Sequence, residues 1–319
     1  MRNETHPVPF KLHRTPDETL QRYKDARNKS IKSGKPDATD QELKALGDPD
    51  NQLSDAALLA LLQAPCAYCA TTPSLGVDRV DSDQGYLRHN VVPCCASCNY
   101  GKCNGKWFDF VTHVLQMTVA ASPDRLDNQS TPKHEQTTDA KQLALAAAPA
   151  TNSEDDSDVE ETWSLACGQK LLLGEQRPAN YWYKVRHRAA EKKIAFDISA
   201  HVRDALETPD TTCAYCPMTR ANVVLGLDRV ANDGGYVDNN VVPCCWQCNW
   251  LKRAMTVSQF AAHVAAMQKQ LEKLRPTVNT DANQLRRQFQ RDAIDAVSVE
   301  TDERTAWHRV IDLYSLPAL

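Results

Sequence analysis

Cysteines in closely spaced pairs are the residues of this sequence whose types and spacing are best suited to chemistry. Two Cys-x-x-Cys pairs lie within residues 66–98, and two more lie within residues 213–248. One such turn can present two thiolates to a single ion, so two turns supply the four soft ligands that tetrahedral zinc prefers. We therefore predict two structural Zn²⁺ ions, one held by Cys66, Cys69, Cys95 and Cys98, the other by Cys213, Cys216, Cys245 and Cys248.

Other interpretations of these cysteines are weaker. A thioredoxin-like redox pair would need a βαβ unit, which the flanking sequence does not predict. Ordinary buried cysteines would not repeat the same paired arrangement twice. Cys94 and Cys244 directly precede the second pair of each set, and we expect them to be small core residues. A register in which they replace Cys95 and Cys245 as ligands stays open.

The chain contains one module written twice. Residues 75–99 and 225–249 align with a constant offset of 150, and 16 of the 25 positions are identical. The length differs by three residues, just after the first Cys-x-x-Cys pair. Two widely separated copies cannot stack into a solenoid, so the repeat indicates duplication of a small domain.

Between its cysteine pairs each copy predicts a β-hairpin followed by a helix. In the first copy, residues 75–80 have a strand pattern, residues 83–86 read as a turn, and residues 90–93 as a returning strand. The second cysteine pair then opens a helix. The expected fold class is α+β: two small zinc-bound treble-clef ββα modules with flanking helices.

Helices are also expected on both sides of each module. Ser54 and Ser199 are suitable N-caps for helices that Pro65 and Pro209 would stop. After the second cysteine pair, apolar residues recur at the i, i+3, i+4, i+7 spacing of a buried helical face. Packing is the expected role of the two histidines on this face. The recurring positions are Phe110, His113, Val114 and Met117 with Phe260, His263, Val264 and Met267.

Composition divides the remaining chain. Residues 121–162 carry ten acidic and three basic residues, a local net charge of −7. The whole chain has a net charge of −4, so the rest of the chain carries +3. This acidic segment is expected to be a disordered linker that leaves the modules independent. The predicted layout is an N-terminal helical extension (1–62), module 1 (63–120), the linker (121–162), a basic helical lead-in (163–209), module 2 (210–275) and a C-terminal helical tail (276–319).

The sequence argues against membrane insertion and secretion. No apolar run approaches the roughly 20 residues that span a bilayer. The first residues have no apolar core of the kind found in a secretory signal. We expect an intracellular protein, in the nucleus or another compartment that contains nucleic acid.

The order of motifs in each copy resembles the HNH nuclease superfamily. Both copies run from Cys-x-x-Cys through Asp-Arg-Val and Gly-Tyr to Asn-Val-Val-Pro-Cys-Cys-x-x-Cys-Asn. This order is most similar to the zinc-bound branch that includes phage recombination endonuclease VII. The resemblance covers roughly residues 63–120 and 210–270, and it implies a ββα-metal fold inside a treble-clef zinc site.

The resemblance also implies a hydrolytic site with a missing component. A strand Asp and a helix Asn would hold Mg²⁺, and a His after the Asp would be the general base. Arginine stands at that position and cannot accept a proton from water, although it could grip a phosphate. His89 is a substitute base for copy one alone. The structural alternatives are an ion pair at the Asp and a cap at the Asn. The positions concerned are Asp78, Arg79 and Asn99 with Asp228, Arg229 and Asn249.

Basic residues around the second copy suggest a surface for nucleic acid. Five Lys and Arg stand among the ten residues 184–193, with one acid. The expected contact residues are Lys184, Arg186, Arg188, Lys192, Lys193, Lys252 and Arg253. The leading hypothesis is a tandem HNH-like zinc protein that binds nucleic acid, with DNA as the expected partner and any endonuclease activity impaired. The alternatives are an active metal-dependent endonuclease and a non-enzymatic zinc-stapled scaffold.

Overall fold

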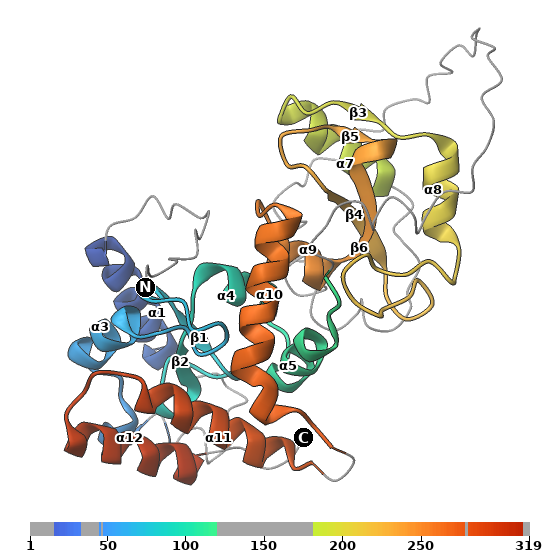
Figure 1. The fold of residues 1–319 in the computed structure, drawn as a ribbon. Coiled ribbons are helices and arrows are strands. Elements are labelled where there is room, and N and C mark those ends of the chain that lie inside the picture. The colour runs from blue at the N-terminus through green and yellow to red at the C-terminus, as the bar shows by residue number, and fades with distance from the viewer. Residues whose placement is uncertain (1–15, 33–44, 46, 120–180, 278–279, 315–319) are drawn as a thin grey trace, which may run out of the picture.

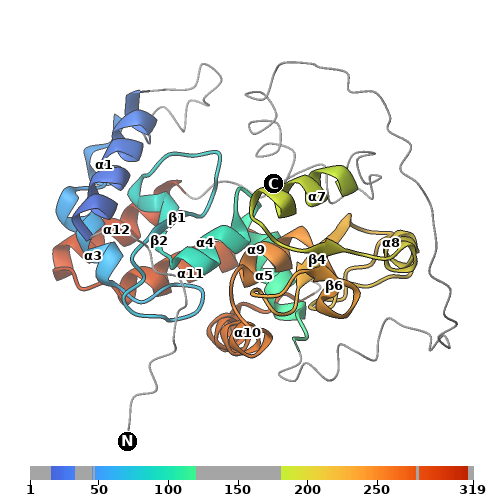
Figure 2. The same cartoon turned by 90° about the horizontal axis from the view of Figure 1, so that it is seen from above.

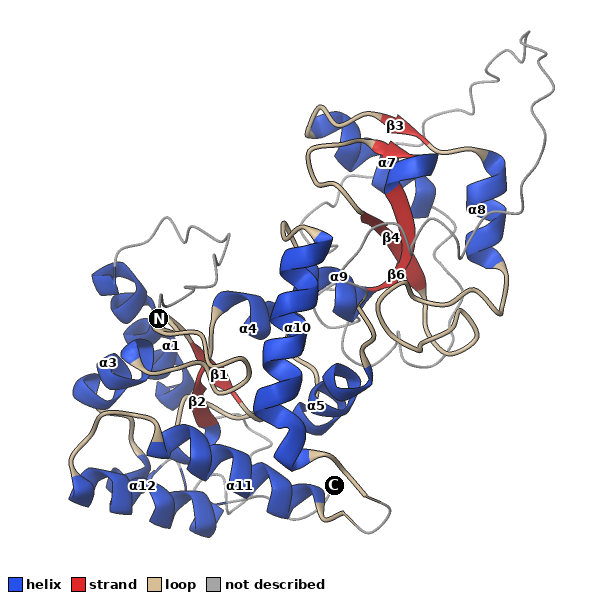
Figure 3. Cartoon of the chain, viewed as in Figure 1, coloured by secondary structure: helices blue, strands red, loops and turns tan. Residues whose placement is uncertain are grey.

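The computed structural model describes residues 16–32, 45, 47–119, 181–277 and 280–314 (Figure 1). The segment expected to be the acidic linker, residues 121–162, lies outside the described residues. Helices dominate the described part, and the strands form short two-stranded sheets (Figure 3). Within it, no helix combines the length and the apolar composition that a membrane crossing requires. The fold is mixed α+β.

The first module is built on a short antiparallel hairpin. Strand β1 (Val77–Arg79) pairs with β2 (Val91–Pro93), and helix α4 (Ala96–Lys102) follows directly. Helix α5 (Trp107–Gln116) comes next and buries its apolar face. The other elements at this end of the molecule are α1 (Pro16–Lys32), η1 (Pro49–Asn51), α3 (Asp55–Gln63) and η2 (Arg88–Asn90).

The second module repeats this arrangement with a longer hairpin. Asp78 lies opposite Val92 in the first hairpin, and Asp228 lies opposite Val242 in the second, so the register is the same. The elements are β4 (Leu225–Arg229), β5 (Tyr236–Val237), η5 (Asp238–Asn240), β6 (Val241–Cys245), α9 (Trp246–Lys252), α10 (Val257–Leu271) and η6 (Glu272–Leu274). The order of hairpin then helix that the sequence predicts is present in both copies.

The helices before the modules begin where the sequence indicates. The Ser54 hydroxyl accepts a hydrogen bond from the backbone N–H of Ala57 at the start of α3. The Ser199 hydroxyl does the same for Val202 at the start of α8 (Ala200–Glu207). A side-chain acceptor satisfies one of the backbone N–H groups that a helix leaves free at its first turn. Both predicted N-caps are confirmed.

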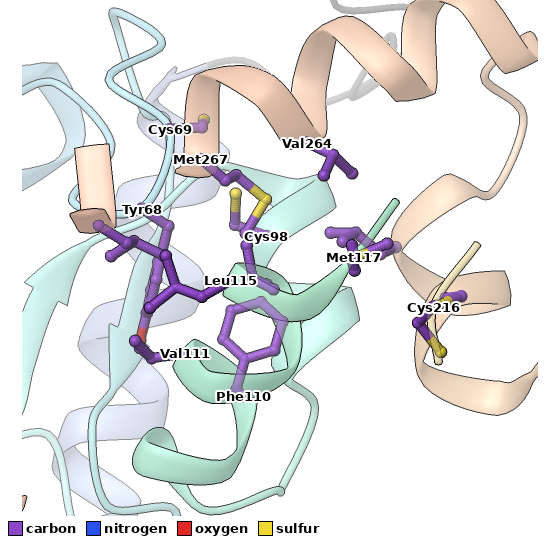
Figure 4. Close-up of a cluster of buried hydrophobic side chains, with 14 of the residues drawn as sticks. Tyr68, Cys69, Cys98, Phe110, Val111, Leu115, Met117, Cys216, Val264 and Met267 are labelled. Carbon is purple, nitrogen blue, oxygen red and sulfur yellow. The ribbon is translucent and has the colours of Figure 1, made fainter. Parts of the chain in front are cut away.

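The two modules pack against each other and share one hydrophobic core, so the expectation of independent modules is wrong. Helix α4 packs against α9, and α5 packs against α10 (Figures 1 and 2). The Tyr68, Phe110 and Met117 side chains of the first module belong to the same buried cluster as Val264 and Met267 of the second (Figure 4). A continuous apolar core across two modules makes their folding interdependent.

Each hairpin is also covered by a helix that precedes its module. The Tyr23 hydroxyl of α1 accepts a hydrogen bond from the backbone N–H of Val77 at 3.0 Å. In the second module the Tyr181 hydroxyl of α7 (Tyr181–Glu191) lies against Gly226 of β4, where a Cβ would approach it to 3.1 Å. Strand β3 (Phe196–Asp197) then pairs in parallel with β5. The duplication therefore extends upstream of the cysteines.

The C-terminal helices cover the first module. Helices α11 (Ala282–Asp295) and α12 (Thr301–Tyr314) pack on the β2 and η2 side of the first hairpin (Figure 1). The Trp307 indole N–H donates to the backbone oxygen of Arg88 at 2.6 Å. The Phe289 ring lies 5.0 Å from the Tyr68 ring, centroid to centroid. The sequence predicts both helices, but it does not predict the module against which they pack.

The closest approach between the modules gives a stability prediction. A Cβ on Gly101 of α4 would lie 2.6 Å from a methyl carbon of Leu251, which is fully buried in α9. We expect Gly101→Val to lower the free energy of unfolding by about 1–3 kcal/mol, because overpacking forces the two helices apart. Urea unfolding followed by circular dichroism measures the change. Gly47→Ala is the matched control, since nothing lies within 4 Å of a Cβ there, and an equal loss in both variants would contradict the prediction.

Candidate metal centres and the hairpin–helix network

The first cysteine cluster has the composition that the sequence predicts. The sulfur atoms of Cys66, Cys69, Cys95 and Cys98 all lie within 4.8 Å of one another, and all four residues are buried. The first pair comes from the loop after α3, where the Ala67 N–H donates to the β2 backbone at Pro93 over 2.9 Å. The second pair comes from the start of α4. Cys94 stays outside the cluster, so the alternative register is not used.

The second cluster contains a residue that the sequence analysis assigned to core packing. Its compact set consists of His113 from the first module with Cys216, Cys245 and Cys248 from the second, all buried and within 4.8 Å of one another. Cys213 borders this set, and its sulfur accepts the backbone N–H of Cys245 at 3.3 Å. Four ligand atoms therefore lie close enough for one ion, with Cys213 beside them. The role of Cys213 as a ligand stays a prediction.

The geometry of both clusters fits zinc. The Sγ atoms of Cys69 and Cys95 lie 3.7 Å apart, and those of Cys216 and Cys245 lie 3.8 Å apart. Two thiolates about 2.3 Å from a tetrahedral ion would be about 3.8 Å apart. Because zinc binds the thiolate, these two buried clusters are consistent with two structural zinc ions.

A buried ion pair lies beside each hairpin. The Lys102 ammonium donates to the Asp78 carboxylate at 3.2 Å and to the backbone oxygen of Arg79 at 2.8 Å. The Tyr68 hydroxyl donates to the other oxygen of Asp78 at 2.7 Å. Burial raises the pKa of Asp78, while the neighbouring Lys102 charge lowers it. This Tyr–Asp–Lys triad joins the cysteine loop, the first strand and the helix.

The second module repeats the triad with the same geometry. The Tyr215 hydroxyl donates to Asp228 at 2.6 Å, and the Lys252 ammonium lies 3.0 Å from the same carboxylate. Lys252 is fully buried, so its prediction as a nucleic-acid contact is wrong. Its ammonium also donates to the backbone oxygen of Arg229 at 2.9 Å.

The aspartate and asparagine positions do not fit a magnesium ion. Both oxygens of Asp78 accept hydrogen bonds, one of them from a lysine that a divalent cation would repel. The Asn99 amide donates to the strand oxygen of Val77 at 3.3 Å, and the Asn249 amide to that of Leu227 at 3.1 Å. An ion pair is present at each Asp, but its partner is a Lys of the following helix rather than the adjacent Arg, and each Asn binds the strand rather than capping a turn.

The arginines that follow these aspartates close the hairpin turns. The Arg79 guanidinium donates to the backbone oxygen of Gln84 at 2.9 Å and lies 5.3 Å from the centre of the Tyr86 ring. The Arg229 guanidinium donates to the Gly234 oxygen at 2.8 Å and lies over the Tyr236 ring. In each copy the Asp-Arg motif therefore supplies the arginine of one contact, and the Gly-Tyr motif supplies its tyrosine. The two motifs act together, rather than as a base position and a separate turn.

His89 is buried, and both of its ring nitrogens have hydrogen-bond partners. Its Nδ1 lies 3.0 Å from the Asn51 side-chain oxygen, and its Nε2 lies 2.7 Å from that of Gln84. Burial and, secondly, the Arg286 charge lower the pKa of His89 to about 3. A histidine held on both nitrogens in the interior is not placed to activate water for the first copy.

The predicted basic residues are exposed mainly on α7 and the turn that follows it. Arg186, Arg188, Lys192 and Lys193 are exposed, and Lys184 is half-buried. Arg253 lies elsewhere, at the contact between the modules, where its guanidinium stacks 3.8 Å from the centre of the Tyr100 ring. The predicted contact residues are thus not one continuous element, and the α7 group is the exposed part.

Comparison with known proteins gives one partial similarity. No protein-family model and no solved structure matches this chain. A segment is 32% identical over 72 residues to uncharacterized protein R423 of Acanthamoeba polyphaga mimivirus. The similar segment is 23% of this chain and 13% of the viral protein.

Metal analysis tests the two centres directly. Protein purified without added metal should contain about two zinc ions per chain, since two buried four-residue clusters are present. Inductively coupled plasma mass spectrometry gives the stoichiometry. Cys98→Ser and Cys248→Ser should each remove about one ion, while Cys103→Ser, at a half-buried cysteine outside both clusters, should remove none. Full retention of zinc in the two ligand variants would refute the assignment.

The buried triad predicts a large stability effect. Asp228→Asn should lower the free energy of unfolding by about 3–5 kcal/mol, because it leaves the buried Lys252 charge without its counter-ion. Adding Lys252→Met should recover much of the loss, since no buried charge then remains. Chemical denaturation measures both variants, and Asp233→Asn, at an exposed turn position, is the control. Unchanged stability in Asp228→Asn would contradict the structural role of the pair.

Proposed function

We propose that this protein binds nucleic acid, with DNA as its partner, through the exposed cations of α7 and of the turn that follows it, and that its zinc-stapled hairpin–helix units are HNH-like scaffolds that do not hydrolyse the bound strand. The observation that carries the proposal is a group of exposed cations on α7, a helix anchored to the second module, and on the turn that follows it. The HNH-like assignment rests on the order of motifs and on the hairpin–helix units that they form.

Tyr181 and Ala189 fix α7 against the second module, and the cations of this segment stay exposed. Tyr181 lies against β4, and Ala189 is fully buried. Arg186 and Arg188 of the helix and Lys192 just after it are exposed. Cations held on a rigid element attract the phosphate backbone and displace its counter-ions, which is the main source of affinity for nucleic acid.

An exposed aromatic side chain lies on the same helix. The Tyr183 side chain is 69% exposed, and its ring centroid lies 5.9 Å from that of His187. An exposed aromatic face beside cations can stack on an unpaired base, whatever the sequence. This combination supports contact with single-stranded or locally opened DNA as well as with the duplex backbone.

The absence of hydrolysis is supported by what surrounds the positions that the resemblance makes catalytic. Asp78 and Asp228 are engaged by Tyr and Lys in the interior. Arg79 and Arg229 are engaged by turn carbonyls and tyrosine rings. A metal that clamps a scissile phosphate needs open coordination positions beside the strand, and these side chains are committed to internal contacts.

A charge-neutralised variant tests the binding surface. Replacing Arg186, Arg188, Lys192 and Lys193 with Gln should weaken binding to labelled single-stranded and duplex DNA. It should also lower the slope of log affinity against log salt concentration by about one for each phosphate that the variant no longer neutralises. Fluorescence anisotropy over a range of salt concentrations measures both quantities, and incubation of the DNA with protein and Mg²⁺ should give no cleavage.

The control neutralises four exposed cations outside α7, and should leave most of the affinity and the salt slope intact. These are Lys106, Lys269, Lys273 and Arg275. Equal weakening in both variants would show that binding depends on the overall charge of the protein rather than on the cations of α7 and the turn after it. Mg²⁺-dependent cleavage that Asp228→Ala abolishes, in protein shown to be folded by circular dichroism, would favour the active endonuclease instead.

A further inference from the structure

Each metal centre is in contact with a histidine that belongs to the other module. His113 of α5 lies 3.3 Å from the Cys248 sulfur, measured from Nε2. His263 of α10 lies 3.5 Å from the Cys98 sulfur, again from Nε2. The two histidines and the two cysteines stand at equivalent positions of the duplicated sequence, 150 residues apart in each case. The contact is therefore reciprocal.

The reciprocity distinguishes an outer hydrogen bond from direct coordination. The first cluster already has four sulfur ligands, so His263 has no vacant position to fill there. The second cluster has four cysteines as well, once Cys213 beside it is included. His113 lies closer to its cluster than His263 does, since its Nε2 is also 4.0 Å from the Cys245 sulfur. The equivalent positions of the two histidines and of the two thiolates that they contact nevertheless point to one role, and that role has to fit the complete first site.

We propose that His113 and His263 are exchanged between the modules, where each donates its Nε2–H to a zinc-bound thiolate of the opposite module and so interlocks the two centres. They are positioning residues for the metal sites: zinc is held by the cysteines, and the histidines hold the last cysteine of each set. The two zinc ions then belong to one assembly rather than to two separate domains.

The charge of a tetrathiolate centre explains why such donors are useful. Four thiolates and one Zn²⁺ carry a net charge of about −2, and burying that charge is costly unless hydrogen bonds compensate it. The ligand thiolates are buried, with Cys98 and Cys248 fully so. An imidazole N–H directed at a thiolate stabilises the negative charge and fixes the orientation of the ligand.

The surrounding contacts hold the exchanged histidines in place. The Gln268 amide of α10 donates to the backbone oxygens of Val114 and Met117, at 3.1 and 2.9 Å, just after His113 in α5. The backbone N–H of Thr118 donates to the Tyr215 oxygen at 3.1 Å, in the cysteine loop of the second module. Separation of the modules would break these bonds together with both histidine–thiolate contacts.

¹¹³Cd NMR of the full chain, with cadmium replacing zinc, tests the exchange. Two resonances in the tetrathiolate region are expected, and Cys66→Ser and Cys216→Ser assign them through the signal that each removes. His263→Leu should shift the first-module resonance, and His113→Leu the second-module resonance, because each loses a hydrogen bond from across the interface. Release of zinc to a chromogenic chelator from the affected site should be roughly 10–100-fold faster.

The controls separate this role from simple packing. His113→Gln and His263→Gln keep a side-chain N–H and should retain zinc better than the Leu variants. His201→Leu, at an exposed position on α8, should shift neither resonance. The proposal is overturned if each Leu variant shifts the resonance of its own module, if neither shifts, or if the native second site resonates as a trithiolate–imidazole centre. If a Leu variant does not fold, the shifts of the Gln variants decide between the same outcomes.

Discussion

The contact between α4 and α9 is the constraint on which the rest of this structure depends. Leu251 fills the space left by the absent side chain of Gly101, which lets the two helices approach closely. Both helices begin at the second cysteine pair of their module, so this approach also brings the metal centres into one core. Modules of about 60 residues bury too little surface to be comfortably stable alone. Packing them together supplies the missing burial and places each module's histidine against the other's thiolates.

The residues shared by the two copies are accounted for by contacts within the fold. The tyrosine of each first cysteine pair binds the strand aspartate, and the lysine of the following helix completes the pair. The Asn90 and Asn240 amides, at equivalent positions, each bind backbone on both sides of a turn. Identity between copies of a duplicated sequence therefore reflects a common network of buried polar groups, and such networks tolerate substitution poorly because an unpaired member is costly. Catalysis is not needed to explain it.

Much of the local structure was predictable from sequence, and the tertiary partners were not. Cysteine spacing, the hairpins and the caps at Ser54 and Ser199 follow from short-range rules, and they were identified from residues a few positions apart. The partner of His113 lies 135 residues away, at Cys248. Helical periodicity placed that histidine on a buried face, but it could not say that the face packs against another metal site.

The burial of Lys252 was missed for the same reason, since its counter-ion comes from a strand. A lysine at the same place in both copies, four residues after the last cysteine of each set, was the available signal.

The two copies differ most in what covers the end of the hairpin. In the first module η2 is buried, with α12 packed against it and the Arg88 backbone held by Trp307. In the second module none of the equivalent residues in η5 is buried. The neighbouring elements are β3, which pairs with β5, α7, which packs against β3, and α8, whose N-cap Ser199 donates its backbone N–H to Asp238 (Figure 1). Duplication thus gives one copy that is enclosed by the C-terminal helices and one copy that carries an exposed basic helix.

Because the enclosed copy shares its core and its metal-site contacts with the exposed one, it can act as a rigid support. A surface held on such a support loses less conformational entropy when it binds a partner. This difference in covering is the physical reason for placing the proposed nucleic-acid surface on the second module.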